Sequence, residues 1–325
     1  MHATADHEPA RQRRVPRLPA DAGIGLGLLA EIAAFALLSP HFLTGENLLN
    51  VTLQISITAI IAAGMTFVIL TGGIDLSVGS LLALVGVTAA GLAKLPLPPA
   101  GAVGLALTGG ILLGLLSGSA AGVLVTRFRV TPFIVTLALM TVWRGMAFIV
   151  TEGRPVWDLP EAFGVLGNGR LLGVPVPSLL MLATYVLSWL VLERTRFGRH
   201  VYATGGNAAA ARLAGIATGR VLVTVYALCG ALTALSGVLL ASRLNSGQPN
   251  AGMMYELDAI AAVVVGGTSL NGGRGSVLGT FIGAMLIGVL RNGLNLLNVD
   301  SYVQQVVVGV VILAAVMADR LRRRD

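Results

Sequence analysis

Residues 101–125 read GAVGLALTGGILLGLLSGSAAGVLV, a run of 25 residues without a charged side chain. A helix needs about 20 apolar residues to cross the roughly 30 Å hydrocarbon core of a bilayer, so this run is long enough. A strand of a membrane barrel would instead alternate apolar and polar residues over about ten positions. Because the run is apolar on every face, it predicts a membrane-spanning α-helix.

Nine further apolar segments occur along the 325-residue chain, which is 55% hydrophobic and only 11% charged. This composition lies far outside the range of water-soluble domains. The ten segments lie at about 22–39, 51–71, 76–93, 101–125, 131–150, 174–192, 220–242, 258–270, 275–298 and 301–318. The sequence therefore predicts an all-α integral membrane protein of about ten transmembrane helices. Its transmembrane domain would occupy 21–318, between a basic tail at 1–20 and a short tail at 319–325.

Basic residues around these segments predict their orientation, because Lys and Arg gather on the cytoplasmic side of membrane proteins. If the amino terminus is cytoplasmic, sixteen of the 22 Lys and Arg residues fall in inside segments and only four fall outside. The four outside residues are Lys94, Arg154, Arg170 and Arg243. We therefore expect both termini in the cytoplasm and an even number of helices. The same bias accounts for the net charge of +7 without a nucleic-acid partner.

Two places interrupt the helical pattern. Segment 258–270 offers only about twelve apolar residues, AIAAVVVGGTSL, too few to cross at about 1.5 Å per residue. The stretch TGGIDLSVGS at 71–80 separates two apolar runs with glycines. Each break has two interpretations. It marks a transport path, where irregular backbone lies beside protein or water, or it is a tight turn at the membrane surface. The candidate path residues are Gly72, Gly73, Asp75, Ser77, Gly79 and Ser80.

Three carboxylates near these breaks have two interpretations each. Asp75 precedes a helix expected near Leu76 and would cap its free N–H groups, yet an ionisable residue at membrane depth is also a functional candidate. Glu256 and Asp258, in YELD at 255–258, stand where an outside loop enters the short segment. They would cap that segment, contact a partner on the outside, or both.

Small and basic residues inside the apolar segments predict which helix faces meet protein. Glycines recur every four residues at Gly110, Gly114, Gly118 and Gly122, and again at Gly279 and Gly283, a spacing that allows close helix approach. We expect Arg144 to face other helices rather than lipid, because a charge exposed to lipid is costly. Two interpretations stay open for Arg291: it reaches the outer surface, or it pairs with a carboxylate across a dimer.

The largest inside loop, 193–220, contains a short helix signal. Asn207 is a good N-cap, the alanines after it are strong helix formers, and Gly215 is a typical stop. Residues 208–214 would form a rod about 10 Å long, flanked by basic residues. On these residues alone, the rod would either dock into a groove on a partner or lie on anionic lipid.

The sequence offers no pattern for chemistry on this chain. A phosphate-binding GxxxxGK[ST] loop needs Gly before its Lys, but the single lysine, Lys94, follows Ala93. The four histidines are scattered outside the apolar runs, and the single Cys229 can form no intramolecular disulfide. We therefore expect a non-enzymatic chain without cofactor or metal; if ATP drives it, another subunit must bind ATP and Mg.

Long stretches resemble the permeases of bacterial ribose, xylose and arabinose ATP-binding-cassette importers. They are GMTFVILTGGIDLSVGSLLAL at 64–84, GRHVYATGGNAAAARLAGI at 198–216, YELDAIAAVVVGGTSLNGGRGSVLGTFIGA at 255–284 and RNGLNLLNVDSYVQQVVVGVVIL at 291–313. The likeness runs from about 40 to 318, and the ribose permeases are the most similar. It implies a multi-pass permease of the bacterial inner membrane for ribose or a related pentose, paired with a second copy of itself.

The same resemblance implies partners on both sides of the membrane. A cytoplasmic ATPase would dock on the rod, and the residues implied in this coupling are Gly205, Gly206, Asn207, Ala208, Ala209, Arg212, Leu213, Gly215 and Ile216. A periplasmic sugar-binding protein would deliver sugar on the side of Glu256 and Asp258. The alternative is an ion-coupled secondary transporter of a small polar solute, for which only Glu31, Asp75 and Asp258 offer titratable groups. A membrane-embedded enzyme ranks last, since no catalytic triad can be assembled.

Overall fold

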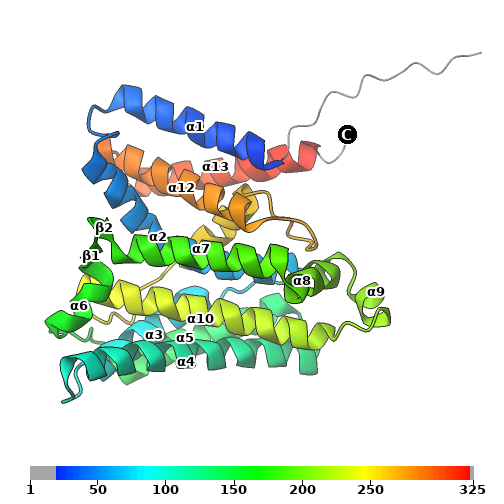
Figure 1. The fold of residues 1–325 in the computed structure, drawn as a ribbon, viewed down its shortest axis with the longest axis horizontal. Helices are drawn as coiled ribbons and strands as arrows, with labels where there is room; N and C mark the ends of the chain where they lie inside the picture. Colours follow the sequence, from blue (N-terminus) through cyan, green and yellow to red (C-terminus); the bar gives the residue numbers. More distant parts are fainter. Residues whose placement is uncertain (1–19, 323–325) are drawn as a thin grey trace, which may run out of the picture.

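The computed structural model describes residues 20–322, which form thirteen helices and one two-stranded hairpin (Figure 1). The tail expected at 1–20 lies outside the described residues except for Ala20, whereas of the tail expected at 319–325 only 323–325 lie outside and the rest continues α13. Each predicted apolar segment contains a helix, which confirms the all-α prediction. These ten helices are α1 (Ala20–Leu38), α2 (Gly45–Leu70), α3 (Val78–Ala93), α4 (Pro99–Arg127), α5 (Pro132–Val150), α7 (Val176–Arg194), α10 (Thr218–Leu244), α11 (Tyr255–Val265), α12 (Val277–Leu296) and α13 (Ser301–Arg322).

Length and apolarity separate these helices into groups. Six of them, α2, α4, α5, α7, α10 and α12, are long and apolar enough to cross a membrane, and shorter apolar stretches lie in α1, α3 and α13. The most buried of the six is α2, with 83% of its most apolar window inside the protein, against 17% for α5. A helix that is apolar on every face belongs inside a bundle, so α2 forms the centre, against α7, α10, α11 and α12.

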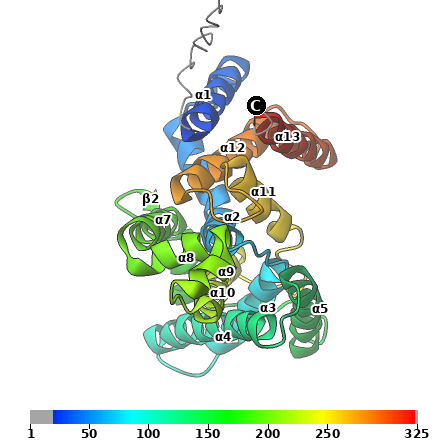
Figure 2. The same cartoon turned by 90° about the vertical axis from the view of Figure 1, so that its right-hand side faces the viewer.

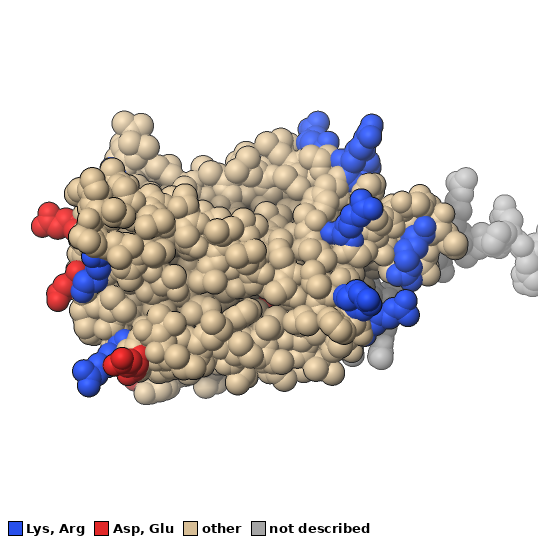
Figure 3. All heavy atoms as spheres, turned by 90° about the horizontal axis from the view of Figure 1, so that it is seen from below, with Lys and Arg blue, Asp and Glu red and all other residues tan. Residues whose placement is uncertain are grey.

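The remaining elements lie at the two ends of the bundle. Helix α6 (Glu161–Asn168) and the antiparallel hairpin β1 (Arg170–Leu171) and β2 (Val174–Pro175) lie at one end, whereas α8 (Arg196–Gly206) and α9 (Ala208–Leu213) lie at the other (Figure 1). The start of α1 and the end of α13 lie at the α8 and α9 end as well. Lys and Arg side chains gather there, and the acidic side chains in view lie at the opposite end (Figure 3).

The glycine spacing has the predicted role in packing. A Cβ on Gly114 would collide with the carbonyl oxygen of Gly230, and one on Gly118 with that of Tyr226, so α4 packs backbone to backbone on α10. The second predicted stripe behaves alike, since a Cβ on Gly283 would collide with the carbonyl oxygen of Ala262 in α11. These close approaches confirm that the glycines shape helix contacts.

The most unusual segment of the fold is the chain between α10 and α11, residues 245–254, which we call the re-entrant segment. It starts at Asn245, whose left-handed φ of 50° ends α10, and Gly247 then forms an antiparallel bridge with Val156. From there it runs back along α3: Gly247 packs beside Ala90, whereas Gly252 packs on Gly79. Gly79 and Ala90 are eleven positions apart, about 16 Å along the helix, so the segment runs well into the bundle.

Helix α11 therefore starts level with the first turn of α3, partway along the bundle, and Met253, Met254 and Leu257 beside its start are exposed. It has only 11 residues, about 16 Å of helix. This confirms that the short eighth segment cannot cross a membrane as a helix by itself. Irregular backbone at such a depth is tolerated where protein or water surrounds it, and here α3 and α5 do so.

Candidate functional site

The break after α2 is an ordered turn held by a buried carboxylate. Asp75 is only 1% exposed, and its Oδ1 accepts hydrogen bonds from the backbone N–H (2.9 Å) and the hydroxyl (2.6 Å) of Ser77. Helix α3 begins at Val78, two residues later than the expected start near Leu76. Asp75 thus satisfies the N–H just ahead of the helix instead of those inside its first turn. A carboxylate that accepts two such bonds has a structural role in this turn.

The six candidate path residues do not form one cluster. Gly72 lies against the backbone of Asn271, and the next residue, Gly272, packs on both Gly72 and Gly205 of α8. Gly79, in the first turn of α3, instead faces Gly252 and the carboxylate of Glu256, where a Cβ would collide with both. The stretch 71–80 therefore takes part in two separate contacts. One is a junction at one end of the bundle, and the other is the contact of α3 with the re-entrant segment.

The junction brings three chain segments into backbone contact. The N–H of Gly273 donates a 2.9 Å hydrogen bond to the carbonyl oxygen of Leu70. Gly205, near the end of α8, lies against the same two groups, and a Cβ there would collide with both. By contrast, a Cβ on Gly206 would meet nothing within 4 Å. Helix α8 is thus seated directly on the end of α2 and on the turn at 269–275, and we call this contact the three-loop junction.

Helix α9 forms as the sequence predicts. The Oδ1 of Asn207 accepts hydrogen bonds from the N–H groups of Ala209 and Ala210, both 3.0 Å, and the stop at Gly215 has a left-handed φ of 82°. The helix protrudes from the end of the bundle (Figure 1) and lies in front of it in the end-on view (Figure 2). Leu213 is 92% exposed at its tip. A large apolar side chain held in water on a short, well-capped helix is typical of a contact with a partner.

A hollow of about 740 Å³ lies beside α9, between the turn after α4 and the start of α10. Arg129 and Arg212 line it together with Thr131 and Thr218. Arg129 has a left-handed φ of 54° in the tight turn that joins α4 to α5. The hollow and α9 form one continuous surface that carries Arg129 and Arg212, and no sequence pattern had indicated the contribution of Arg129.

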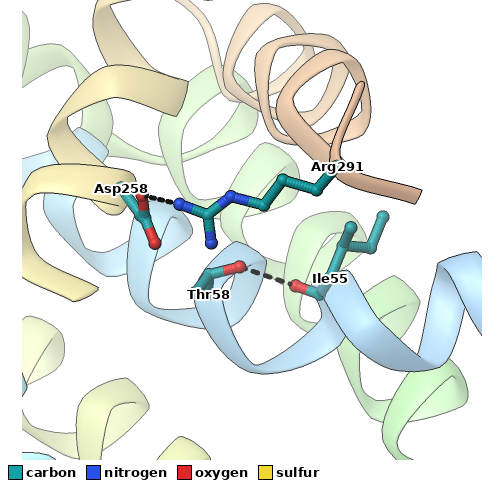
Figure 4. A network of polar contacts seen from close by, with 4 residues as sticks. All are labelled: Ile55, Thr58, Asp258 and Arg291. Atoms are coloured by element: carbon teal, nitrogen blue, oxygen red, sulfur yellow. Dashed lines mark hydrogen bonds and ion pairs between the residues drawn. The ribbon is translucent and has the colours of Figure 1, made fainter. Parts of the chain in front are cut away.

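At the start of α11, a carboxylate pairs with an arginine. Asp258 Oδ1 lies 2.6 Å from Arg291 Nη2 of α12, with the side chains 12% and 41% exposed (Figure 4). Arg291 therefore has a carboxylate partner inside its own chain, which the open alternatives for this residue did not include. The pair lines a cavity of about 140 Å³ together with Gln54, Thr58 and Tyr255.

Arg144 of α5 forms hydrogen bonds with the re-entrant segment. Its Nη1 donates hydrogen bonds to the carbonyl oxygens of Pro249 and Ala251, both 2.7 Å. These carbonyls belong to non-helical backbone deep in the bundle and need a donor, because a buried unpaired carbonyl is costly. The expectation that Arg144 faces protein is confirmed. An arginine inside an apolar segment, followed much later by NSGQPNAG at 245–252, is the signal that could have suggested this pairing.

The titratable groups considered for ion coupling lie on separate elements. Glu31 is on α1, Asp75 in the turn before α3, and Asp258 on α11. Among the described residues, no group of three His, Cys, Asp or Glu side chains could hold a metal ion. Cys229 is a buried free thiol in α10.

Comparisons with known proteins agree on one family. Residues 47–316 match the family described as the branched-chain amino acid transport system / permease component. The chain is 50% identical to the ribose import permease protein RbsC of Bacillus subtilis (strain 168) over 297 residues, 91% of each chain. It is 49% identical to RbsC of Escherichia coli (strain K12), over 92% of this chain and 93% of that one. The L-arabinose ABC transporter permease protein AraH of Azospirillum brasilense is 39% identical, over 98% of this chain and 93% of the relative. No solved structure matches the chain.

Proposed function

We propose that this chain, which belongs to the branched-chain amino acid transport system / permease component family, is the membrane-spanning subunit of an ATP-driven importer of a monosaccharide, ribose or a related pentose. The observation that carries the proposal is the 50% identity to a ribose import permease over 91% of both chains. The relatives for L-arabinose and D-allose, at 39% and 38% identity, keep the substrate within small sugars. The protein is a multi-pass protein of the bacterial inner membrane.

In this proposal ten helices span the membrane, with α11 and the re-entrant segment together making one crossing. The end with α8 and α9 is cytoplasmic, because basic residues gather there (Figure 3). The start of α1 and the end of α13 lie at that end, as an even number of crossings requires. Both termini are then cytoplasmic.

Coupling to a separate ATPase takes place at α9 in this proposal. Leu213 is exposed at the tip of α9 and Arg212 lines the hollow beside it, while Gly205 seats α8 on the three-loop junction. ATP and Mg are bound by that ATPase, and no cofactor is bound by this chain. A second copy of the permease and a periplasmic sugar-binding protein complete the importer.

The binding protein would meet the end of the bundle that carries α6 and the hairpin. Glu256 and Asp258 start α11 below that surface, so a contact of the binding protein with them stays a prediction. In the structure Asp258 instead pairs with Arg291.

The test is sugar uptake by liposomes that contain the permease with its ATPase, with the sugar-binding protein outside. We expect labelled ribose to enter only when ATP is enclosed, and a protonophore to leave uptake unchanged. Uptake driven by a proton or sodium gradient without ATP would instead support the ion-coupled alternative.

The Leu213→Asp variant tests the coupling surface in the same liposomes. An acidic side chain at this tip should abolish stimulated ATP hydrolysis without lowering the melting temperature, because Leu213 contacts little of its own chain. Leu213→Met, which keeps a large apolar side chain at the same exposed tip, is the matched control and should support normal ATP hydrolysis and uptake. If Leu213→Asp supports normal ATP hydrolysis and uptake, α9 is not the coupling element.

A further inference from the structure

The cavity between α2, α11 and α12 has the chemistry of a small sugar site. Its polar residues come from three helices: Gln54 and Thr58 from α2, Tyr255 and Asp258 from α11, and Arg291 from α12. In Figure 4 the Asp258 and Arg291 side chains meet beside Thr58. We propose that this cavity is a contact site for the transported sugar within the permease, an inference that rests on the function proposed above.

Helix packing alone does not explain the ion pair. Charged side chains inside a membrane protein are costly, and apolar residues of similar size usually hold two helices together at least as well. Asp258 and Arg291 form the only ion pair among the side chains that the structure describes. With Arg291 41% exposed, the pair is open to a ligand rather than sealed between the helices.

The cavity residues also have unused hydrogen-bonding capacity. A guanidinium carries five N–H donors, and Arg291 uses one of them on Asp258. The second carboxylate oxygen of Asp258 has no partner among the described residues, nor has the exposed side-chain amide of Gln54. Thr58 donates to the carbonyl of Ile55 at 3.2 Å, which leaves its hydroxyl oxygen free to accept. Donors and acceptors therefore converge on one space of about 140 Å³.

This set of groups suits a neutral polyhydroxylated ligand better than an ion. The carboxylate and the guanidinium cancel in charge, so neither an anion nor a cation is attracted by a net field. Each sugar hydroxyl is both a donor and an acceptor, and the cavity offers both functions side by side. Ile55, Ala262 and Ile287 line the rest of the space and can meet the C–H faces of a sugar ring.

The position of the cavity in the fold also supports a sugar-contact site. Its α11 residues, Tyr255 and Asp258, lie in the first turn of a helix that starts partway along the bundle, after non-helical backbone. Discontinuous helices of this kind are the usual place for substrate contacts in transporters, because a solute needs polar groups at membrane depth.

A cysteine-protection experiment tests the proposal, and the chain is suited to it because its one native thiol, Cys229, is fully buried. Gln54→Cys places a reactive thiol in the cavity, and Leu171→Cys on the hairpin is an exposed control. Both variants are assembled with the ATPase in lipid nanodiscs and labelled with a small, water-soluble methanethiosulfonate. We expect millimolar ribose to slow labelling of Gln54→Cys several-fold and to leave Leu171→Cys unchanged.

A second substitution in the Gln54→Cys background sharpens the test. Thr58→Val removes a cavity hydroxyl, whereas Thr108→Val removes a hydroxyl that also bonds to its own helix but lies on α4. The ribose concentration that gives half-protection should rise about threefold to tenfold with Thr58→Val, the usual effect of one lost hydrogen bond. It should stay unchanged with Thr108→Val.

The outcomes separate the inference from the function on which it rests. If the wild-type complex imports ribose but ribose does not slow labelling of Gln54→Cys, the sugar site is wrong and the importer stands. Protection that is equally strong with Thr58→Val also overturns the site. If the wild-type complex imports no sugar with ATP, the proposed function itself fails.

Discussion

Helices α9 and α11 are both short, yet they are built by opposite means. The cap and the stop of α9 come from Asn207 and Gly215, each next to the helix in sequence. The chain that leads into α11 depends on Arg144, whose hydrogen bonds to Pro249 and Ala251 join positions more than 100 residues apart. The contrast teaches that the exposed helix is a local structure and the interior one a product of the whole fold.

The two helices should therefore respond differently to substitution. Changes around α9 should alter coupling and leave the bundle intact, because most residues of α9 are exposed and only Ala211 is buried. Changes to the hydrogen bonds of the re-entrant segment before α11 should lower stability, because Pro249 is buried and its carbonyl finds a donor only in the folded chain.

The largest effect is expected from Arg144→Met, which removes the donor from two deep carbonyls. Leaving buried carbonyls unpaired should cost about 2–5 kcal/mol, seen as a much lower melting temperature in detergent and less protein in the membrane. Arg154→Met, at an exposed arginine in the loop after α5, is the matched control and should be neutral. A stable Arg144→Met protein would contradict the view that the chain before α11 depends on the whole fold, since the re-entrant segment would then keep its conformation without hydrogen bonds from α5.

The next effect is expected at the three-loop junction. Gly205→Ala places a methyl group against the backbone of Leu70 and Gly273, and the strain should cost about 1–3 kcal/mol. Gly206→Ala adds the same methyl group one residue later into open space and should have no measurable effect. Melting temperature and ATP-dependent uptake, measured for both, decide the matter. Equal behaviour of the two variants would show that α8 is not seated on the junction.

A smaller effect is expected from Asn207→Ala, which removes the cap of α9. The loss of capping should destabilise this helix by about 1 kcal/mol and reduce uptake, while the melting temperature of the bundle stays unchanged. Asn207→Ser keeps a capping oxygen and should restore uptake. A fall in the melting temperature with Asn207→Ala would contradict the view that α9 is independent of the bundle.

The smallest effect is expected from Asp75→Asn. The amide oxygen of Asn can accept the same two hydrogen bonds from Ser77, so uptake should change less than twofold and stability by less than about 0.5 kcal/mol. Asp75→Leu, which cannot accept them, should lower both. Loss of uptake in a normally inserted Asp75→Asn protein would show that the charge itself is used in transport.

Some of the features behind these predictions could be inferred from the sequence, and others could not. The ten apolar segments, the glycine contacts of α4 and the short helix expected at 208–214 follow from composition and local spacing, and the structure contains them all, with the short helix at Ala208–Leu213. The partner of Arg291 and the two carbonyls under Arg144 did not follow, because both depend on which segments meet in space. Helix α8 was missed because glycines and basic residues interrupt its pattern.

The three-loop junction has a mechanical meaning. Between most packed helices, side chains can change rotamer and absorb a small displacement. At Gly205 the backbone of α8 rests directly on the backbone of Leu70 and Gly273, with no side chain between them. A displacement of α8 and α9 therefore cannot be absorbed by side-chain rearrangement at this contact. It is transmitted directly to the end of α2 and to the turn that leads into α12.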